Sequence, residues 1–204
     1  LPGIYQARGQ LACMVIAKRE RPAVFSREQA EQLAQDGAIV LAEQQGEQPL
    51  LLIASGSYQL AEMQRAAVRL SAAGCAWRLI YLQEPGRFRA PRDRWEQAAL
   101  APSELSERLF PASCPYRVLL THMRPEVARG HLWPILGDGP RNAVLGYRNR
   151  GGTLDEAGML FANSATWAHV LQAVGGLLNR PLGDFLDADE AAAVQGKGDP
   201  RCLR

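Results

Sequence analysis

The sequence predicts an α/β domain of three layers, built on a mostly parallel sheet of roughly five strands. Its clearest sign is Pro49–Ala54 (PLLLIA), a continuous apolar run typical of a parallel strand buried on both faces. A small turn, Ser55–Ser57, leads into a helix over Gln59–Ala73, and a second strand follows over Cys75–Leu82. This order makes a β-α-β unit, whose crossover we expect to be right-handed.

The residues before this unit do not follow its rhythm of strand and helix. Leu11–Ala17 (LACMVIA) has the length and composition of a strand, and a helix is predicted over Ser26–Gln35, whose first residue can form a capping box with Gln29. Ala38–Ala42 is a further short apolar run. We therefore assign residues 1–45 to a linker arm that precedes the domain.

Strands and helices continue to alternate after the β-α-β unit. Pro85–Pro111 is a polar, Arg- and Pro-rich excursion with two short helices. A strand is predicted over Tyr116–Thr121, a helix over Pro125–Leu136 and a last strand over Asn142–Tyr147. The pattern is that of one sheet covered by helices on both faces.

Two helices are expected to close the domain, which we place at residues 46–183. Thr153 and Glu156 have capping-box spacing and predict a helix reaching about Phe161. Asn163 or Ser164 is expected to cap a longer helix that ends near Leu178. Residues 184–204 lose periodicity, and we expect them to form a mobile tail.

Composition excludes several classes of protein. The 204 residues are 47% hydrophobic and 22% charged, with a net charge of +2, so no electrostatic feature indicates nucleic acid or an anionic membrane as a partner. No apolar run approaches the roughly 20 residues that span a bilayer. The start at Leu1 has no initiator Met and no signal-peptide pattern, and we expect a fragment or a processed chain.

Four cysteines are too widely spaced for a C-x-x-C motif; they are Cys13, Cys75, Cys114 and Cys202. We expect reduced thiols and a cytoplasmic location.

No self-contained active site is recognisable. The turn Ser55–Ser57 precedes a helix, as anion sites do, but it lacks a G-x-G-x-x-G or P-loop pattern, so a tight turn is the more economical interpretation. His122 follows a strand, at the edge where α/β folds place their sites, without a partner at helical spacing. His131 and His169 lie on predicted helices and are expected to be structural or surface residues. The acidic residues of 184–190 are expected to be solvated rather than metal ligands.

Two stretches resemble phosphoketolases. Residues 15–74 resemble the passage of that family from its pyrimidine-binding domain into its C-terminal domain: a strand ending in Lys18, a Pro-containing linker, a helix, an acidic turn, a strand, a small turn and a long helix. Residues 145–174 are similar to the family's Gly-Tyr, basic, Gly-Thr, Met, Asn and His pattern. The matching residues are Gly146, Tyr147, Arg148, Gly151, Thr153, Met159, Asn163 and His169.

The resemblance implies a transketolase-like C-terminal domain of a lyase that depends on thiamine diphosphate and Mg²⁺. Such an enzyme splits xylulose 5-phosphate, often also fructose 6-phosphate, with inorganic phosphate to give acetyl phosphate and an aldose phosphate. Cofactor and metal would belong to the preceding domains of a homo-oligomer, and this chain would bind neither. Lys18 matches the family's lysine near the substrate phosphate, where an ammonium group suits a phosphate.

The sequence also departs from the phosphoketolase pattern. Lys18 is followed by Arg19-Glu20 rather than a polar residue and Pro, and Thr153 stands where the family has several threonines. The C-terminal domain of a transketolase or of a 2-oxo-acid dehydrogenase is the close alternative. A stand-alone α/β binding module is the alternative from a different class.

Overall fold

A computed structural model describes residues 20, 22–137, 139–150 and 152–204. The strands are β1 (Ala38–Gln44), β2 (Leu50–Ser55), β3 (Trp77–Leu82), β4 (Arg117–Thr121) and β5 (Asn142–Leu145). The α-helices are α2 (Arg27–Asp36), α3 (Ser57–Ala72), α4 (Arg94–Gln97), α5 (Ser103–Leu109), α6 (Pro125–Leu136), α7 (Glu156–Ala162), α8 (Trp167–Leu178) and α9 (Ala188–Val194). Short 3-10 helices are η1 (Pro85–Phe88), η2 (Gly139–Arg141), η3 (Leu182–Asp184) and η4 (Pro200–Leu203).

The five strands form one sheet in the order β1-β3-β2-β4-β5. Strands β3, β2, β4 and β5 are parallel to one another, and β1 pairs antiparallel with β3 at one edge. The predicted α/β class, with a mostly parallel sheet of about five strands, is confirmed.

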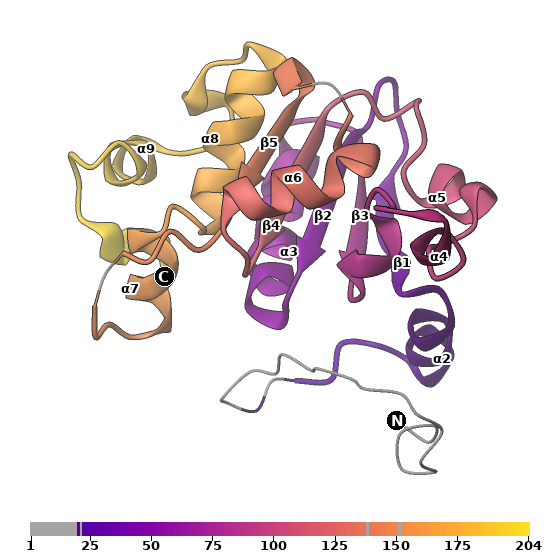
Figure 1. Cartoon of the computed structure of the whole chain (residues 1–204). Coiled ribbons are helices and arrows are strands. Elements are labelled where there is room, and N and C mark those ends of the chain that lie inside the picture. Colours follow the sequence, from indigo (N-terminus) through magenta and orange to yellow (C-terminus); the bar gives the residue numbers. More distant parts are fainter. Residues whose placement is uncertain (1–19, 21, 138, 151) are drawn as a thin grey trace.

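Helices cover both faces of this sheet (Figure 1). Along β2 the side chains alternate: Leu50 and Leu52 pack in one core with residues of α3 and α8, while Leu51 and Ile53 pack in the other with residues of α5 and α6. All four are at most 1% exposed, and burying each such side chain stabilises the fold by about 1.5–3 kcal/mol. This two-sided burial explains why the strand is a continuous apolar run. No helix among the described residues could cross a membrane.

The end of the expected linker arm belongs to the sheet, which corrects the sequence-based assignment. Helix α2 begins after Ser26, which forms the predicted capping box with Gln29. Strand β1 follows at once and pairs with β3 from Ala38 to Gln44. The sequence did not reveal this pairing because the partner strand lies about forty residues further along the chain. Residues 1–19 and 21 lie outside the described part of the chain.

The expected mobile tail is also corrected by the structure. Helix α9 begins with a capping box formed by Asp187 and Glu190, and η4 brings Leu203 into the core at 3% exposure. The indole N–H of Trp167 donates to the Leu203 carbonyl at 3.0 Å, and Arg204 pairs with Asp155 beside α7 (Figure 1). Residues 184–204 therefore pack against the domain.

The two closing helices begin later than predicted. The N-cap of α7 is Asp155, whose carboxylate accepts from the Gly158 N–H at 2.8 Å, and not Thr153. The N-cap of α8 is Thr166, and not Asn163 or Ser164. Asn163 instead ends α7, and its side chain has a different task, described below.

Candidate functional site

After the neighbouring strands β2 and β4 the chain continues toward opposite edges of the sheet. From β2 it passes through α3 to β3, and from β4 it passes through α6 to β5 on the other side. Helices α3 and α6 lie on opposite faces of the sheet. The carboxyl ends of β2 and β4, at Ser55 and Thr121, therefore flank the topological switch point, where open α/β sheets place their ligand crevice.

A pocket of about 380 Å³ opens at this edge, and we call it the switch-point pocket. Its walls come from the first turn of α3, the end of β4, the loop after β5, helix α7 and the residues that follow α7. The lining residues are Tyr58, Gln59, Thr121, Tyr147, Leu154, Asp155, Glu156, Met159, Leu160, Asn163 and Ala165.

The turn after β2 places Gln59 in the lining of the pocket. Gly56 has φ 115°, a backbone conformation that side-chain-bearing residues rarely adopt. A Cβ at this position would overlap the side-chain oxygen of Gln59, so the glycine leaves the space that the amide occupies. Neither serine caps α3, whose N-cap is Gly56 itself. The turn therefore positions Gln59, a residue that the sequence analysis did not single out.

The loop after β5 gives the pocket its outer wall. Gly146 passes so close to the end of β4 that a Cβ would overlap the Met123 carbonyl oxygen. The Tyr147 N–H donates to that oxygen at 3.0 Å, and the Tyr147 hydroxyl donates to Asn149 Oδ1 at 3.0 Å. Tyr147 is therefore held at the mouth by the backbone of the neighbouring strand end.

Asn163, which follows α7, holds the β5–α7 loop through its side-chain amide. Its Oδ1 accepts from the N–H groups of Arg148 and Arg150, at 2.7 and 3.2 Å. Its Nδ2 donates to the carbonyls of Arg150 and Met159, at 3.0 and 2.8 Å. One buried amide thus ties the β5–α7 loop to α7. The resemblance to phosphoketolases had marked this residue without indicating its role.

His122 lies at the predicted strand end. Its Nδ1 lies 3.1 Å from the Ser55 carbonyl oxygen, which can only accept, so Nδ1 is the donor in this contact. The same Nδ1 would lie 3.3 Å from a Cβ on Gly56, so the ring is next to the turn that precedes Gln59. No described carboxylate or hydroxyl pairs with it.

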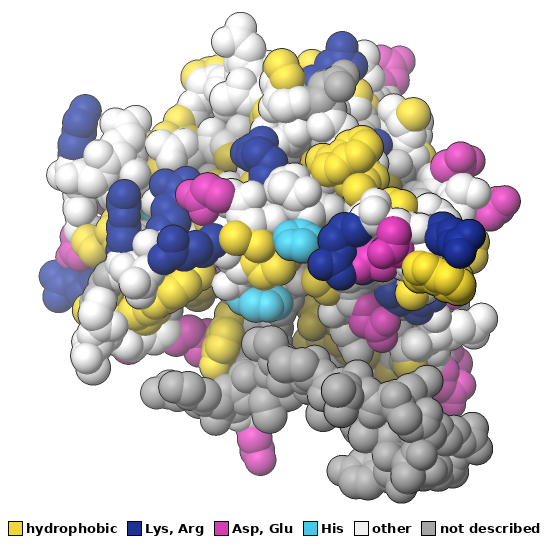
Figure 2. Space-filling model, viewed as in Figure 1, with side chains coloured by type: hydrophobic (Ala, Val, Ile, Leu, Met, Phe, Trp, Pro, Cys, Tyr) yellow, Lys and Arg dark blue, Asp and Glu magenta, His cyan; other side chains and the backbone are white. Residues whose placement is uncertain are grey.

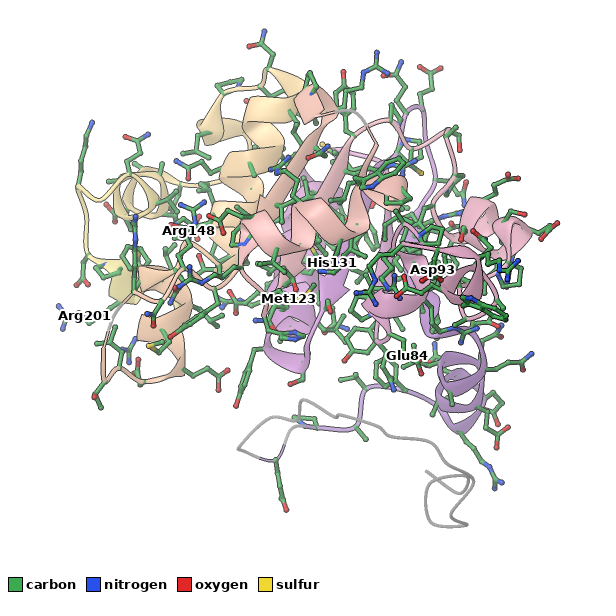
Figure 3. The ribbon with its side chains drawn as sticks, viewed as in Figure 1. Glu84, Asp93, Met123, His131, Arg148 and Arg201 are labelled. Carbon is green, nitrogen blue, oxygen red and sulfur yellow. The ribbon has the colours of Figure 1, made fainter. Side chains whose placement is uncertain are left out.

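The other two histidines lie elsewhere. His169 is 7% exposed, 2.7 Å from the Thr166 hydroxyl, and its ring packs edge-on against Phe161. Burial first, and the charge of Arg148 second, lower the pKa of His169 to about 4. The ring is therefore neutral at pH 7. His131 is exposed on α6 (Figure 3). No hydrogen bond or ring contact joins any two of these three histidines.

The remaining sequence candidates do not form a site among the described residues. Lys18 lies outside the described residues, and its role stays a prediction. In the acidic segment, Asp184 pairs with Arg180 at 2.7 Å, Glu190 pairs with Arg69, and Asp187 caps α9. These carboxylates stabilise the packing of the C-terminal segment. No group of acidic, His or Cys side chains in the described ranges could hold a metal ion.

Three cysteines are free thiols: Cys75 and Cys114 are buried and Cys202 is exposed. Cys13 lies outside the described residues.

Comparison with known proteins relates the chain to a fold. No protein-family model and no curated protein sequence matches it. Among solved structures, transketolase from Leishmania mexicana is similar with a TM-score of 0.51 and 16% identity, over 76% of this chain and 19% of that one. Transketolase from Campylobacter jejuni subsp. jejuni NCTC 11168 has a TM-score of 0.47 and 15% identity, over 78% of this chain and 20% of that one.

The first likeness supports the transketolase-like fold expected from the sequence. The chain spans about a fifth of the length of these structures.

Proposed function

We propose that this chain is the C-terminal domain of a thiamine-diphosphate enzyme of the phosphoketolase type, with a structural and dimerisation role. The observation that supports this most is the likeness of its α/β fold, over 76% of the chain, to part of a transketolase. That fold accompanies a resemblance to phosphoketolases that runs in the same order along the sequence. Neither feature alone specifies the reaction.

The cofactor and metal of such an enzyme are proposed to lie outside this chain. Among the described residues, no cluster of three or more acidic, His or Cys side chains could hold a metal ion. His122 contacts a backbone carbonyl, and the Thr166 hydroxyl and the His169 ring, which form a buried pair, are not part of the switch-point pocket. Thiamine diphosphate and Mg²⁺ would be bound by preceding domains of the same polypeptide, as the resemblance to phosphoketolases implies.

Several of the residues that resemble phosphoketolases are connected in space. Tyr147, Met159 and Asn163 line the switch-point pocket, and the Met159 carbonyl accepts a hydrogen bond from Asn163. A motif that forms one structural unit is better support for the resemblance than scattered identities. Under this proposal the complete enzyme converts xylulose 5-phosphate, fructose 6-phosphate or both, with phosphate, to acetyl phosphate and an aldose phosphate.

The test is turnover by the complete polypeptide with thiamine diphosphate, Mg²⁺, phosphate and xylulose 5-phosphate. Acetyl phosphate is the expected product, and the isolated 204-residue chain should form none. Formation of a longer ketose phosphate from an added aldose phosphate, without acetyl phosphate, would favour a transketolase. Conversion of a 2-oxo acid instead would favour a 2-oxo-acid dehydrogenase.

Lys18 provides a second test in the complete polypeptide. Lys18→Ala should raise KM for the sugar phosphate, since one charge-assisted contact is worth roughly 1.5–3 kcal/mol. Lys18→Arg should rescue only part of this loss, because a planar guanidinium does not replace a compact ammonium. The matched control is Lys197→Ala at an exposed C-terminal lysine. Wild-type kinetics in Lys18→Ala would make Lys18 a linker residue.

A further inference from the structure

We propose that the switch-point pocket binds a nucleotide with an adenine-type base, recognised by the side-chain amide of Gln59. The pocket has the size of ordinary small-molecule sites, which begin at about 300 Å³. It also opens at the place where open α/β sheets bind ligands. This inference is independent of the proposed reaction.

Gln59 is the polar group that requires a partner. It is only 8% exposed, yet its side-chain amide forms no hydrogen bond with any described residue. Among the described residues, every side-chain nitrogen or oxygen that is fully shielded from solvent has a hydrogen-bond partner. The unpaired amide of Gln59 is therefore not fully shielded, and we infer that it faces the pocket that Gln59 lines. Gly56 keeps the space for it open. A ligand with a matching donor and acceptor would satisfy an amide that is otherwise poorly hydrated.

The amide selects the chemistry of the ligand. Its carbonyl and NH₂ present one acceptor and one donor side by side, and this pair is complementary to N6 and N7 of adenine. A purine with a carbonyl at position 6 presents two acceptors there and cannot make both bonds. We therefore infer that the pocket distinguishes adenine from hypoxanthine.

The walls suit a flat, apolar ring. Tyr58 and Tyr147 contribute aromatic surface, and Leu154, Met159 and Leu160 contribute aliphatic surface. Stacking on tyrosine depends little on which base is bound, so these walls supply affinity while Gln59 supplies selectivity. The wall is preformed because the Met123 carbonyl and Asn163 fix the loop that contains Tyr147.

Positive charge next to this wall favours a nucleotide over a nucleoside. Arg148 and Arg150 follow Tyr147, are exposed, and form no ion pair with a described residue. Lys and Arg side chains gather on this part of the surface in Figure 2, in the region where Figure 3 labels Arg148. The carboxylates of Asp155 and Glu156 also line the pocket, and Asp155 pairs with Arg204, so a phosphate attached to the bound base would have to point away from α7 and toward Arg148 and Arg150.

The test is isothermal titration calorimetry on the complete polypeptide with adenosine 5′-monophosphate. Saturable binding is expected, with at least tenfold weaker binding of inosine 5′-monophosphate and weaker binding of adenosine. Gln59→Leu should raise Kd at least tenfold, and Tyr147→Ala about tenfold, the loss of one stacking contact. Tyr147 is 40% exposed, so its variant should fold even if Gln59→Leu does not.

The controls are Gln172→Leu at an exposed glutamine of α8 and Trp95→Ala at a tryptophan that is 74% exposed outside the pocket. Both should keep wild-type Kd. The proposal fails if adenosine 5′-monophosphate does not bind, if it and the inosine nucleotide bind equally, or if Tyr147→Ala leaves Kd unchanged. Because the readout is binding and not acetyl phosphate formation, this failure is distinct from failure of the proposed reaction.

Discussion

Acidification should destabilise the domain through His169. This ring is 7% exposed and packs against Phe161, and the Thr166 hydroxyl is its hydrogen-bond partner. Burial, with a smaller effect of Arg148, lowers its pKa to about 4 in the folded protein. In the unfolded chain a histidine has a pKa of about 6.5. The unfolded state therefore binds more protons between these two values.

The sign and size of the effect follow from this difference. The contribution is fully present above about pH 6.5 and is lost progressively as the pH falls toward 4. Each tenfold difference in proton affinity corresponds to about 1.4 kcal/mol, so the free energy of unfolding should fall by roughly 3 kcal/mol from this residue alone.

Urea denaturation of the chain at a series of pH values between 7 and 4 measures the effect, with His169→Gln as the non-titrating variant. Protonation of carboxylates destabilises both proteins, so the difference between their pH slopes isolates His169. Phe161→Leu is the matched control, since it alters the same cluster and keeps the imidazole. Parallel slopes for wild type and His169→Gln would refute the reasoning.

Three further outcomes are expected. Gly146→Ala should lower the free energy of unfolding, measured by chemical denaturation, by about 1–3 kcal/mol, because the added Cβ would overlap a backbone oxygen. Gly176→Ala is the control: no atom lies near its Cβ, so this change should stabilise α8 by up to about 1 kcal/mol. Equal effects would contradict the close approach of the loop to β4. Leu203→Ala should cost about 2–5 kcal/mol because the side chain is 3% exposed, and an effect as small as that of the exposed Cys202→Ala would mean that the C-terminal segment does not pack. Thiol titration under denaturing, non-reducing conditions should count all four cysteines, with Cys202 the fastest of the three described ones to react in the native protein; a count of two or fewer would reveal disulfides.

The local sequence pattern was sufficient to predict the central strand β2 and the helix α3 that follows it. Strand β2 is buried on both faces, and its apolar run is bounded by a turn and a long helix, so sequence and structure agree there. Strand β1 was mistaken for part of a linker because its place is decided by pairing with β3, which periodicity cannot show. Helix α9 has only seven residues, too few for a reliable period, although the capping box of Asp187 and Glu190 was present as a signal.

The candidate site was only partly accessible from sequence. The positions of Ser55 and His122 followed from the rule that carboxyl strand ends gather at one edge. Gln59 was overlooked because it stands beside Leu60, outside the apolar stripe of α3. Its side chain lies against the turn at Gly56, and it lines a pocket together with residues of α7, a helix about a hundred residues further on. Such contacts depend on tertiary packing.

The most direct test of the central claim is the coding sequence upstream of Leu1. If this chain is the C-terminal domain of a phosphoketolase-type enzyme, the same reading frame must encode domains that bind the diphosphate and pyrimidine parts of thiamine diphosphate before Leu1. A start codon immediately before Leu1, with no such domains, would contradict the account and favour a stand-alone α/β binding module.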